Sequence, residues 1–248
     1  MLFRSMVPRM LGEKAGNLLK TWCESKGVTV HTGTTVETIE STQNELNVVL
    51  NNGEAYPADV VIVSTGVKPN VGFLQDLDIK IDQGIEVDEF MQTSVTDVYA
   101  AGDCAQGLDF STGETAVHAV QPTATEHGQV AATNMATGNS LPYKGSLNMN
   151  ILDTLGLVTS SFGAWEGVDA SDSAEIYNPD NYQYINLQFK DDVLVGANTV
   201  GYHQHLGVLR GLIESRVPLG VWKERLKDNP VGLMEAYIGV TQEATGSA

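Results

Sequence analysis

The hydrophobic residues near the N-terminus repeat at the spacing of a helix. Apolar side chains return every three or four positions, at Leu11, Ala15, Leu18, Leu19 and Trp22. This spacing gathers them on one helical face. Gly27 follows, and glycine is common just beyond the end of a helix because it tolerates left-handed backbone. The pattern predicts one amphipathic helix over residues 11–25.

Short strands are predicted after this helix. Runs of β-branched and apolar residues occupy positions 28–31, 36–40 and 46–50, and another run begins at Tyr56. The sequence Asn51-Asn52-Gly53 is typical of a turn between two such strands. Residues 58–64 carry consecutive valine and isoleucine side chains without polar alternation, which indicates a strand buried on both faces.

The C-terminal part shows strand patterns first and helix patterns afterwards. Strand-length apolar runs occur at residues 147–152, 159–164, 182–189 and 193–198, and Asp191-Asp192 forms a hairpin turn. Helical repeats follow over residues 205–215 and 222–226. This order predicts a sheet covered by helices, the arrangement of an α+β domain.

Residues 93–103 contain the strongest candidate for a ligand contact. The apolar run 98–101 predicts a short buried strand whose end carries only small side chains, so that a ligand can approach the backbone. Asp103 then places a carboxylate at the strand's carboxyl end, where open α/β sheets bind ligands. A charge-assisted hydrogen bond from a ligand hydroxyl is worth about 1.5–3 kcal/mol there. The alternative is a structural strand followed by an aspartate that caps a helix.

A second candidate is the helix predicted over residues 122–135. Pro122 suits the first helical position, where its missing N–H would be unpaired in any residue. Ala124, Gly128 and Ala131 form a face of small residues, which favours close helix packing. The start of such a helix carries about half a positive charge.

Composition and charge narrow the classes of function. The chain has 248 residues, of which 42% are hydrophobic, and its formal net charge is −17. So acidic a chain lacks the basic surface that nucleic acids and anionic membranes require. No apolar stretch reaches the roughly 18 residues of a membrane span, and the N-terminus lacks the apolar core of a signal peptide. We therefore expect a cytoplasmic protein that binds neither nucleic acid nor membranes.

Cysteine and histidine give little evidence of metal or thiol chemistry. Cys23 and Cys104 are the two cysteines, too few for a disulfide scaffold and wrongly spaced for zinc. Cys104 is expected to act as a small hydrophobe. His203 and His205 are two possible ligands without nearby partners, so no metal site is predicted. His118 precedes the predicted helix 122–135 and is expected to be a surface or hinge residue, with an approach to a ligand as the alternative.

Two motifs carry a family resemblance. The run V-V-I-V-S-T-G-V-K-P-N occupies residues 60–70, and T-S-V-T-D-V-Y-A-A-G-D occupies residues 93–103. In this order they resemble the FAD-dependent pyridine nucleotide oxidoreductases, which include NADH oxidases, ferredoxin and rubredoxin reductases, and the flavin part of nitrite reductases. The first resembles the crossing from the NAD domain back to the FAD domain. The second resembles the family's second FAD motif.

This resemblance implies FAD and NAD(P)H as cofactors and assigns roles to particular residues. Asp103 would accept a hydrogen bond from a ribityl hydroxyl of FAD, with Gly102 and Ala101 allowing the approach. The segment Gln121-Pro122-Thr123 would contact the pyrimidine edge of the flavin through its backbone. Thr65 and Gly66 would lie near the cofactor at the domain crossing. No catalytic acid or base is implied, since the flavin supplies the redox chemistry.

The resemblance also implies a partial α/β dinucleotide-binding fold followed by an α+β interface domain. Neither G-x-G-x-x-G turn of the family occurs in the sequence, so we expect the C-terminal part of a longer enzyme. Residues 1–66 would form the second half of an NAD(P)-binding domain, and residues 67–140 the C-terminal segment of an FAD-binding domain. Residues 141–248 would form an interface domain for dimerisation.

The predicted function is hydride transfer from NAD(P)H to flavin and electron transfer to an acceptor, which a redox protein can provide. The alternative is a non-catalytic fragment that dimerises or docks a partner without a cofactor. The choice between NADH and NADPH stays open, because the position that reads the ribose lies in the missing segment.

Overall fold

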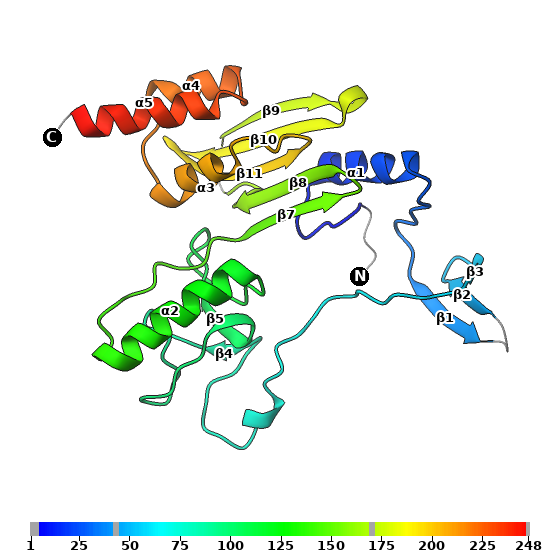
Figure 1. Cartoon of the computed structure of the whole chain (residues 1–248), viewed down its shortest axis with the longest axis horizontal. Coiled ribbons are helices and arrows are strands. Elements are labelled where there is room, and N and C mark those ends of the chain that lie inside the picture. Colours follow the sequence, from blue (N-terminus) through cyan, green and yellow to red (C-terminus); the bar gives the residue numbers. More distant parts are fainter. Residues whose placement is uncertain (1–4, 42–44, 169–171, 247–248) are drawn as a thin grey trace.

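The computed structural model describes residues 5–41, 45–168 and 172–246, which form a mixed α/β structure (Figure 1). Its largest element is a five-stranded antiparallel sheet with the order β7–β8–β11–β10–β9. The strands are β7 (Met149–Thr154), β8 (Leu157–Gly163), β9 (Asp172–Asn178), β10 (Gln183–Lys190) and β11 (Val193–Val200). The four strands predicted in this region are confirmed, and β9 is an additional strand at the edge of the sheet.

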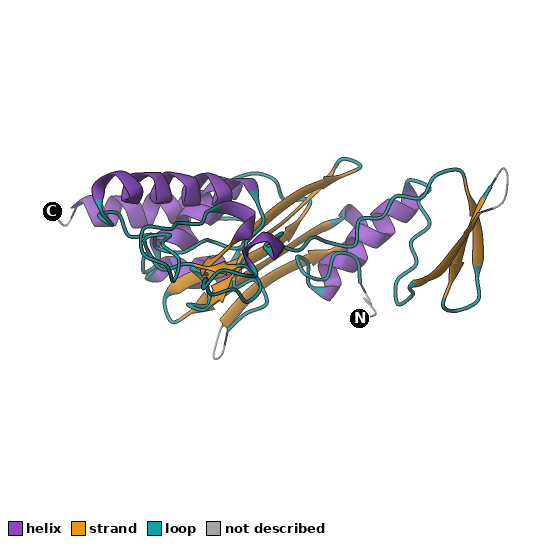
Figure 2. Cartoon of the chain, turned by 90° about the horizontal axis from the view of Figure 1, so that it is seen from below, coloured by secondary structure: helices purple, strands orange, loops and turns teal. Residues whose placement is uncertain are grey.

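Different helices cover the two faces of this sheet (Figures 1 and 2). The three C-terminal helices are α3 (Leu206–Ser215), α4 (Val221–Asp228) and α5 (Leu233–Gly246). Ile185, Leu187 and Phe189 of β10 are buried in one core with these helices. Tyr184 belongs to a second core with the N-terminal helix. Because successive side chains of a strand point to opposite faces, the alternation along β10 separates the two cores.

The predicted N-terminal helix is α1 (Glu13–Ser25). Its Ala15, Leu18 and Leu19 are buried against Leu157 and Val200 of the five-stranded sheet. The apolar spacing of this helix is therefore explained by packing on the C-terminal sheet. This contact joins the first and last of the three predicted domains, and the division at residues 66 and 140 stays a prediction.

A smaller antiparallel meander follows α1. It consists of β1 (Val36–Ser41), β2 (Leu46–Leu50) and β3 (Ala55–Ala58), as the sequence pattern predicted. The turn between β2 and β3 is closed by the Gly53 N–H, which donates to the Leu50 carbonyl at 2.9 Å. Every side chain of β1 is exposed.

Two predicted strands, at residues 28–31 and 58–64, are wrong. Residues 28–31 have irregular backbone, and so do residues 59–64, which follow the last residue of β3, Ala58. Ile62 is 87% exposed, and Val60 and Val63 are also largely exposed. A buried parallel strand needs neighbouring strands for its backbone hydrogen bonds. Ala58 pairs with Leu46 as the last residue of β3, but among the described residues no strand pairs with residues 59–64, so this apolar run stays exposed.

We expect this run to drive self-association of the isolated chain. Exposed apolar patches promote association, and burial of one isoleucine side chain is worth about 1.5–3 kcal/mol. Ile62→Lys should therefore lower the apparent mass measured by light scattering. Gln129→Lys adds the same charge at an exposed position of another element and should have no such effect. Equal association of the two variants would contradict this expectation.

The middle of the chain forms a small unit below the large sheet in Figure 1. Its sheet joins β4 (Ile85–Glu86), β5 (Ala105–Leu108) and β6 (Thr115–Ala116), with β4 and β5 parallel. The predicted helix at residues 122–135 is α2 (Gln121–Thr137), and it ends at Gly138, whose backbone is left-handed. Within the described residues, no helix is both long enough and apolar enough to span a membrane.

Candidate functional site

The candidate residues at 101–103 lie in a turn and not at the end of a strand. Tyr99 forms only an isolated bridge with Gln92, and a 3-10 helix, η2 (Gly102–Cys104), follows. The strand predicted at residues 98–101 is therefore wrong. Gly102 has a φ of +80°, so the backbone leaves the extended conformation just before Asp103.

Asp103 presents a free carboxylate on this turn. The residue is exposed. Across residues 5–41, 45–168 and 172–246, no hydrogen bond or ion pair to its side chain is found. An ionised carboxylate is an acceptor only. Asp103 can therefore accept hydrogen bonds from a ligand without breaking an internal contact. The alternative role as a helix cap has no support, since η2 has no side-chain cap hydrogen bond.

The turn lies against the beginning of α2. A Cβ at Gly102 would lie 3.5 Å from the Ala124 Cβ, and Ala101 packs beside Val130 and Ala131. The bare backbone at positions 101–102 thus allows the close packing that the small-residue face of α2 favours.

The start of α2 is open to a ligand. Gln121 and Pro122 are exposed, whereas Thr123 is buried. The first N–H groups of a helix have no intrahelical partner. In α2 the preceding residue, Val120, provides no side-chain cap for them. Free N–H groups and the helix dipole both favour negative charge at this end. The carboxylate of Asp103 and the open helix start thus fit a ligand that carries hydroxyl groups and an electron-rich edge.

Thr65 and Gly66 are not brought to this turn by any hydrogen bond of the described residues. Both are exposed in irregular backbone. Gly66 has a φ of +103°, and a Cβ there would meet nothing within 4 Å. The left-handed backbone explains the glycine at this position, while a ligand contact for either residue stays a prediction.

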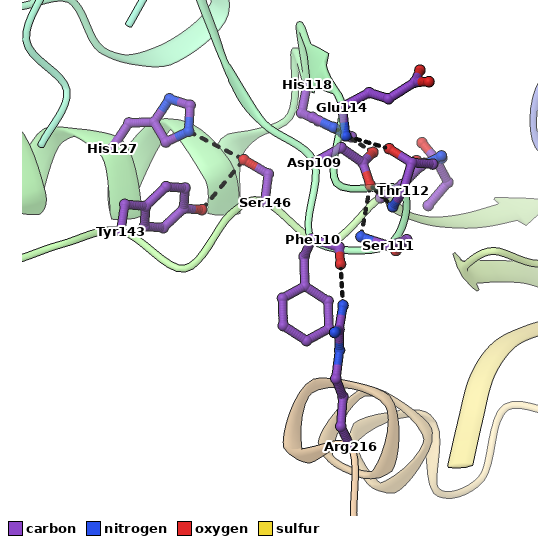
Figure 3. A network of polar contacts seen from close by, with 12 residues as sticks. Asp109, Phe110, Ser111, Thr112, Glu114, His118, His127, Tyr143, Ser146 and Arg216 are labelled. Atoms are coloured by element: carbon purple, nitrogen blue, oxygen red, sulfur yellow. Dashed lines mark hydrogen bonds and ion pairs between the residues drawn. The ribbon is translucent and has the colours of Figure 1, made fainter. Parts of the chain in front are cut away.

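A chain of polar contacts begins at the turn, and Figure 3 shows its members His127, Ser146 and Tyr143. The Gly102 N–H donates to His127 Nδ1 at 3.4 Å, and His127 Nε2 lies 3.1 Å from the Ser146 hydroxyl. The Tyr143 hydroxyl lies 3.3 Å from that of Ser146 and 2.9 Å from a carboxylate oxygen of Glu126. Burial is the main cause that raises the pKa of Tyr143 to about 12. Sequence reasoning missed this role of His127.

A second polar cluster closes the hairpin between β5 and β6. The Asp109 carboxylate accepts the N–H groups of Ser111 at 2.7 Å and Thr112 at 2.9 Å. It also lies 2.9 Å from His118 Nε2. Burial alone would raise the pKa of Asp109, but His118 and the two N–H groups outweigh burial and hold this pKa below its ordinary value. His118, whose side chain is 10% exposed, is therefore a partner in this hairpin and not a free surface residue.

The same hairpin is attached to the C-terminal helices. Arg216 donates to the Phe110 carbonyl at 2.5 Å, and its guanidinium lies 4.3 Å from the centre of the Phe110 ring (Figure 3). The Phe110 N–H in turn donates to the Ser146 carbonyl at 2.9 Å. These contacts place α3 next to the middle unit that carries the candidate site.

Asp109→Asn should lower stability at neutral pH by about 1–3 kcal/mol, since it removes a buried charge-assisted acceptor. The folded-state pKa of Asp109 lies below the ordinary 3.8. Its stabilisation is therefore present above that value and lost as the pH falls through the folded pKa. The difference in unfolding free energy between the wild type and Asp109→Asn should shrink on acidification. Glu114→Gln, at an exposed position, should show no such trend, and a pH-independent difference for Asp109→Asn would contradict the assignment.

The remaining cysteine and histidine candidates do not converge on a centre. Cys23 is buried in the core beneath α1, and Cys104 Sγ lies 3.5 Å from the Ala101 carbonyl oxygen. His203 and His205 are exposed. In the part of the chain that the structure describes, no three His, Cys, Asp or Glu side chains come together to hold a metal.

Comparison with known proteins gives the class to which this arrangement belongs. A solved NAD-dependent persulfide reductase from A. fulgidus shares the fold, with a TM-score of 0.76 and 28% identity, covering 88% of this chain and 44% of that one. NADH-dependent phenylglyoxylate dehydrogenase subunit epsilon from Aromatoleum evansii is 29% identical over 88% of this chain and 52% of its own length. Rubredoxin-NAD(+) reductase from Pseudomonas putida is 26% identical over 84% of this chain and 54% of its own length.

The names of this solved structure and of the two curated relatives describe oxidoreductases that depend on NAD. Residues 3–123 match the family model described as pyridine nucleotide-disulphide oxidoreductase. The resemblance predicted from the two motifs is confirmed. The chain spans about half the length of the two curated relatives.

Proposed function

We propose that this chain supplies the C-terminal part of an FAD-dependent NAD(P)H oxidoreductase. The main observation is that the turn that carries the free carboxylate of Asp103 packs at Gly102 against Ala124, near the uncapped start of α2. An acceptor-only carboxylate suits the hydroxyls of a ribityl chain, and a helix N-terminus suits the electron-rich pyrimidine edge of a flavin. The family match and the nicotinamide dependence in the relatives' names support the same proposal.

The chain's own residues bind and orient in this proposal. The chemistry supplied by a bound FAD is hydride acceptance from NAD(P)H and electron delivery to an acceptor. Asp103 holds a hydroxyl of the cofactor, and Gly102 and Ala101 leave room beside the backbone. The start of α2, at Gln121, Pro122 and Thr123, stabilises negative charge at the pyrimidine edge by about 0.3–2 kcal/mol. Thr65 and Gly66 contact the cofactor at the domain crossing. No residue of this chain is assigned proton transfer.

The test is the flavin content and activity of the enzyme that contains this chain. We expect purified protein with one bound flavin per chain, which oxidises NADH or NADPH in the presence of an artificial electron acceptor. Colourless, folded protein without such activity would overturn the proposal. It would favour the second candidate, a non-catalytic dimerisation or docking module, which the exposed apolar side chains of α4 and α5 support: Val221, Tyr237 and Ile238.

We further propose a homodimer formed through the C-terminal unit, a redox protein as electron acceptor, and a cytoplasmic location. The name of the rubredoxin-NAD(+) reductase supports a protein acceptor, and the exposed apolar residues of α4 and α5 support the dimer. Analytical ultracentrifugation of the enzyme that contains this chain should give the mass of a dimer, and Ile238→Lys in that enzyme should give the mass of a monomer. A wild-type monomer at micromolar concentration would rule out this dimer.

A further inference from the structure

His127 is a buried histidine for which the flavin chemistry gives no reason. It lies on α2, its residue is 1% exposed, and both ring nitrogens face a polar partner. Nδ1 accepts a hydrogen bond from the Gly102 N–H at 3.4 Å. Nε2 lies 3.1 Å from the Ser146 hydroxyl, a contact that Figure 3 shows. A buried imidazole with two specific partners is a positioning element and not only a space-filling side chain.

The contacts fix the protonation state of the ring. Nδ1 accepts a hydrogen bond from the Gly102 N–H and therefore carries no proton. The ring proton lies on Nε2, which donates a hydrogen bond to the Ser146 hydroxyl. The other hydrogen bonds of this polar network are consistent with donation from Nε2 to Ser146. The Glu126 carboxylate only accepts, so the Tyr143 hydroxyl donates to it, and the Ser146 hydroxyl is free to donate to Tyr143. Burial and the nearby His118 lower the pKa of His127, which favours the neutral ring against the opposing effect of Glu126.

The polar chain continues to the C-terminal unit and weakens on the way. Arg210 of α3 donates to Glu126 at 2.9 Å, but the two side chains are 33% and 39% exposed. Ion pairs so accessible to water contribute little. The contacts of His127 with Gly102 and Ser146 lie inside the protein, where an unmade hydrogen bond costs most. The hydrogen bonds of His127 should therefore determine the conformation of the Gly102–Cys104 turn, and the Arg210–Glu126 ion pair should have little effect on it.

We propose that His127 is a positioning residue that holds the Gly102–Cys104 turn through its neutral imidazole and thereby fixes where Asp103 presents its carboxylate. The turn needs such a contact. Gly102 is the residue with the least intrinsic restraint on its backbone, and Asp103 has no partner of its own among the described residues. The consequence for FAD rests on the proposed function, whereas the effect on the turn does not.

Three substitutions separate the two hydrogen bonds. Asn at position 127 places an acceptor oxygen where Nδ1 lies and retains the Gly102 contact. Gln places a donor near the position of Nε2 and retains the Ser146 contact, and Leu retains neither. The measurement is amide hydrogen exchange of Gly102 by NMR on the whole chain, divided by exchange of the Leu187 amide in the C-terminal core. This ratio removes changes in global stability.

We expect His127→Leu and His127→Gln to raise the exchange ratio of Gly102 by about tenfold. His127→Asn should keep the ratio within about threefold of the wild type. Arg210→Gln, at the outer end of the chain, should change it by less than about twofold. If His127 only stabilised the fold, the exchange ratios of Gly102 would follow the melting temperatures of the variants. His127→Asn would then not restore the ratio selectively.

Equal ratios for Asn and Gln would overturn the proposal, as would an unchanged ratio for Leu. If the Leu variant does not fold, the Asn and Gln pair still decides. Nitrogen-15 NMR of the wild-type imidazole gives an independent check, since a proton on Nδ1 contradicts the assignment. Flavin binding distinguishes a failure of the proposed function from a failure of the role of His127 in the turn. Selective rescue by Asn together with unchanged flavin affinity of Asp103→Ala would refute the proposed function and leave the role of His127 in the turn intact.

Discussion

Asp103→Ala should weaken flavin binding by the enzyme that contains this chain about 10- to 150-fold, the equivalent of about 1.5–3 kcal/mol for a charge-assisted hydrogen bond. The carboxylate is exposed and unpartnered among the described residues, so the substitution removes no internal contact of the folded chain. The thermal stability of the flavin-free protein should therefore change little. Asp103→Asn, which keeps an acceptor but no charge, should give a smaller loss.

The measurement is the dissociation constant of FAD, obtained by titrating flavin-free protein and following flavin fluorescence. Glu114→Ala is the matched control, because it removes one exposed carboxylate from the neighbouring hairpin and leaves the turn intact. It should bind FAD like the wild type. Equal affinities for Asp103→Ala and Glu114→Ala would show that Asp103 makes no contact with the cofactor.

Phe189→Ala should destabilise the C-terminal unit by about 3–5 kcal/mol, the usual cost of deleting a buried aromatic ring. Phe189 is 0% exposed and lies in the core between the five-stranded sheet and the C-terminal helices. Its removal leaves a cavity on the face of β10 that those helices cover. Because stabilities of single domains are only about 5–15 kcal/mol, the loss is a large share of the total.

Phe73→Ala provides the same chemical change at a site that is 75% exposed, and its effect should stay within about 0.5 kcal/mol. Urea unfolding followed by far-ultraviolet circular dichroism measures both variants. Similar midpoints for the two would mean that β10 and the helices do not share the core described here.

The elements that sequence predicted best are those whose apolar residues recur at strand or helix spacing. The C-terminal strands and α1 were predicted because their apolar residues follow strand or helix spacing. In β10, Ile185, Leu187 and Phe189 lie in the core with the C-terminal helices, and Tyr184 lies in the core with α1. The strand predicted at residues 58–64 does not form beyond Ala58. The run is apolar, but a strand also needs a neighbouring strand for its backbone hydrogen bonds. In α5, Leu233, Ala236 and Val240 are buried at helical spacing, a signal that sequence reasoning overlooked.

The candidate site was predictable only where residues adjacent in sequence form it. The motif at residues 93–103 singled out the segment that carries Asp103, and the proline at position 122 indicated the start of α2. Their proximity, and the contact of Gly102 with a histidine 25 residues away, depend on tertiary packing that no local pattern contains. The strand expected before Asp103 failed at Gly102, whose left-handed backbone makes a turn that apolar character alone does not reveal.

The most direct test of this account is an experimental structure of the FAD-loaded enzyme. The account predicts the Asp103 carboxylate within hydrogen-bond distance of a ribityl hydroxyl, and the backbone N–H groups at the start of α2 directed at the pyrimidine edge. A structure in which Asp103 faces only bulk water, with the flavin bound away from α2, would contradict it.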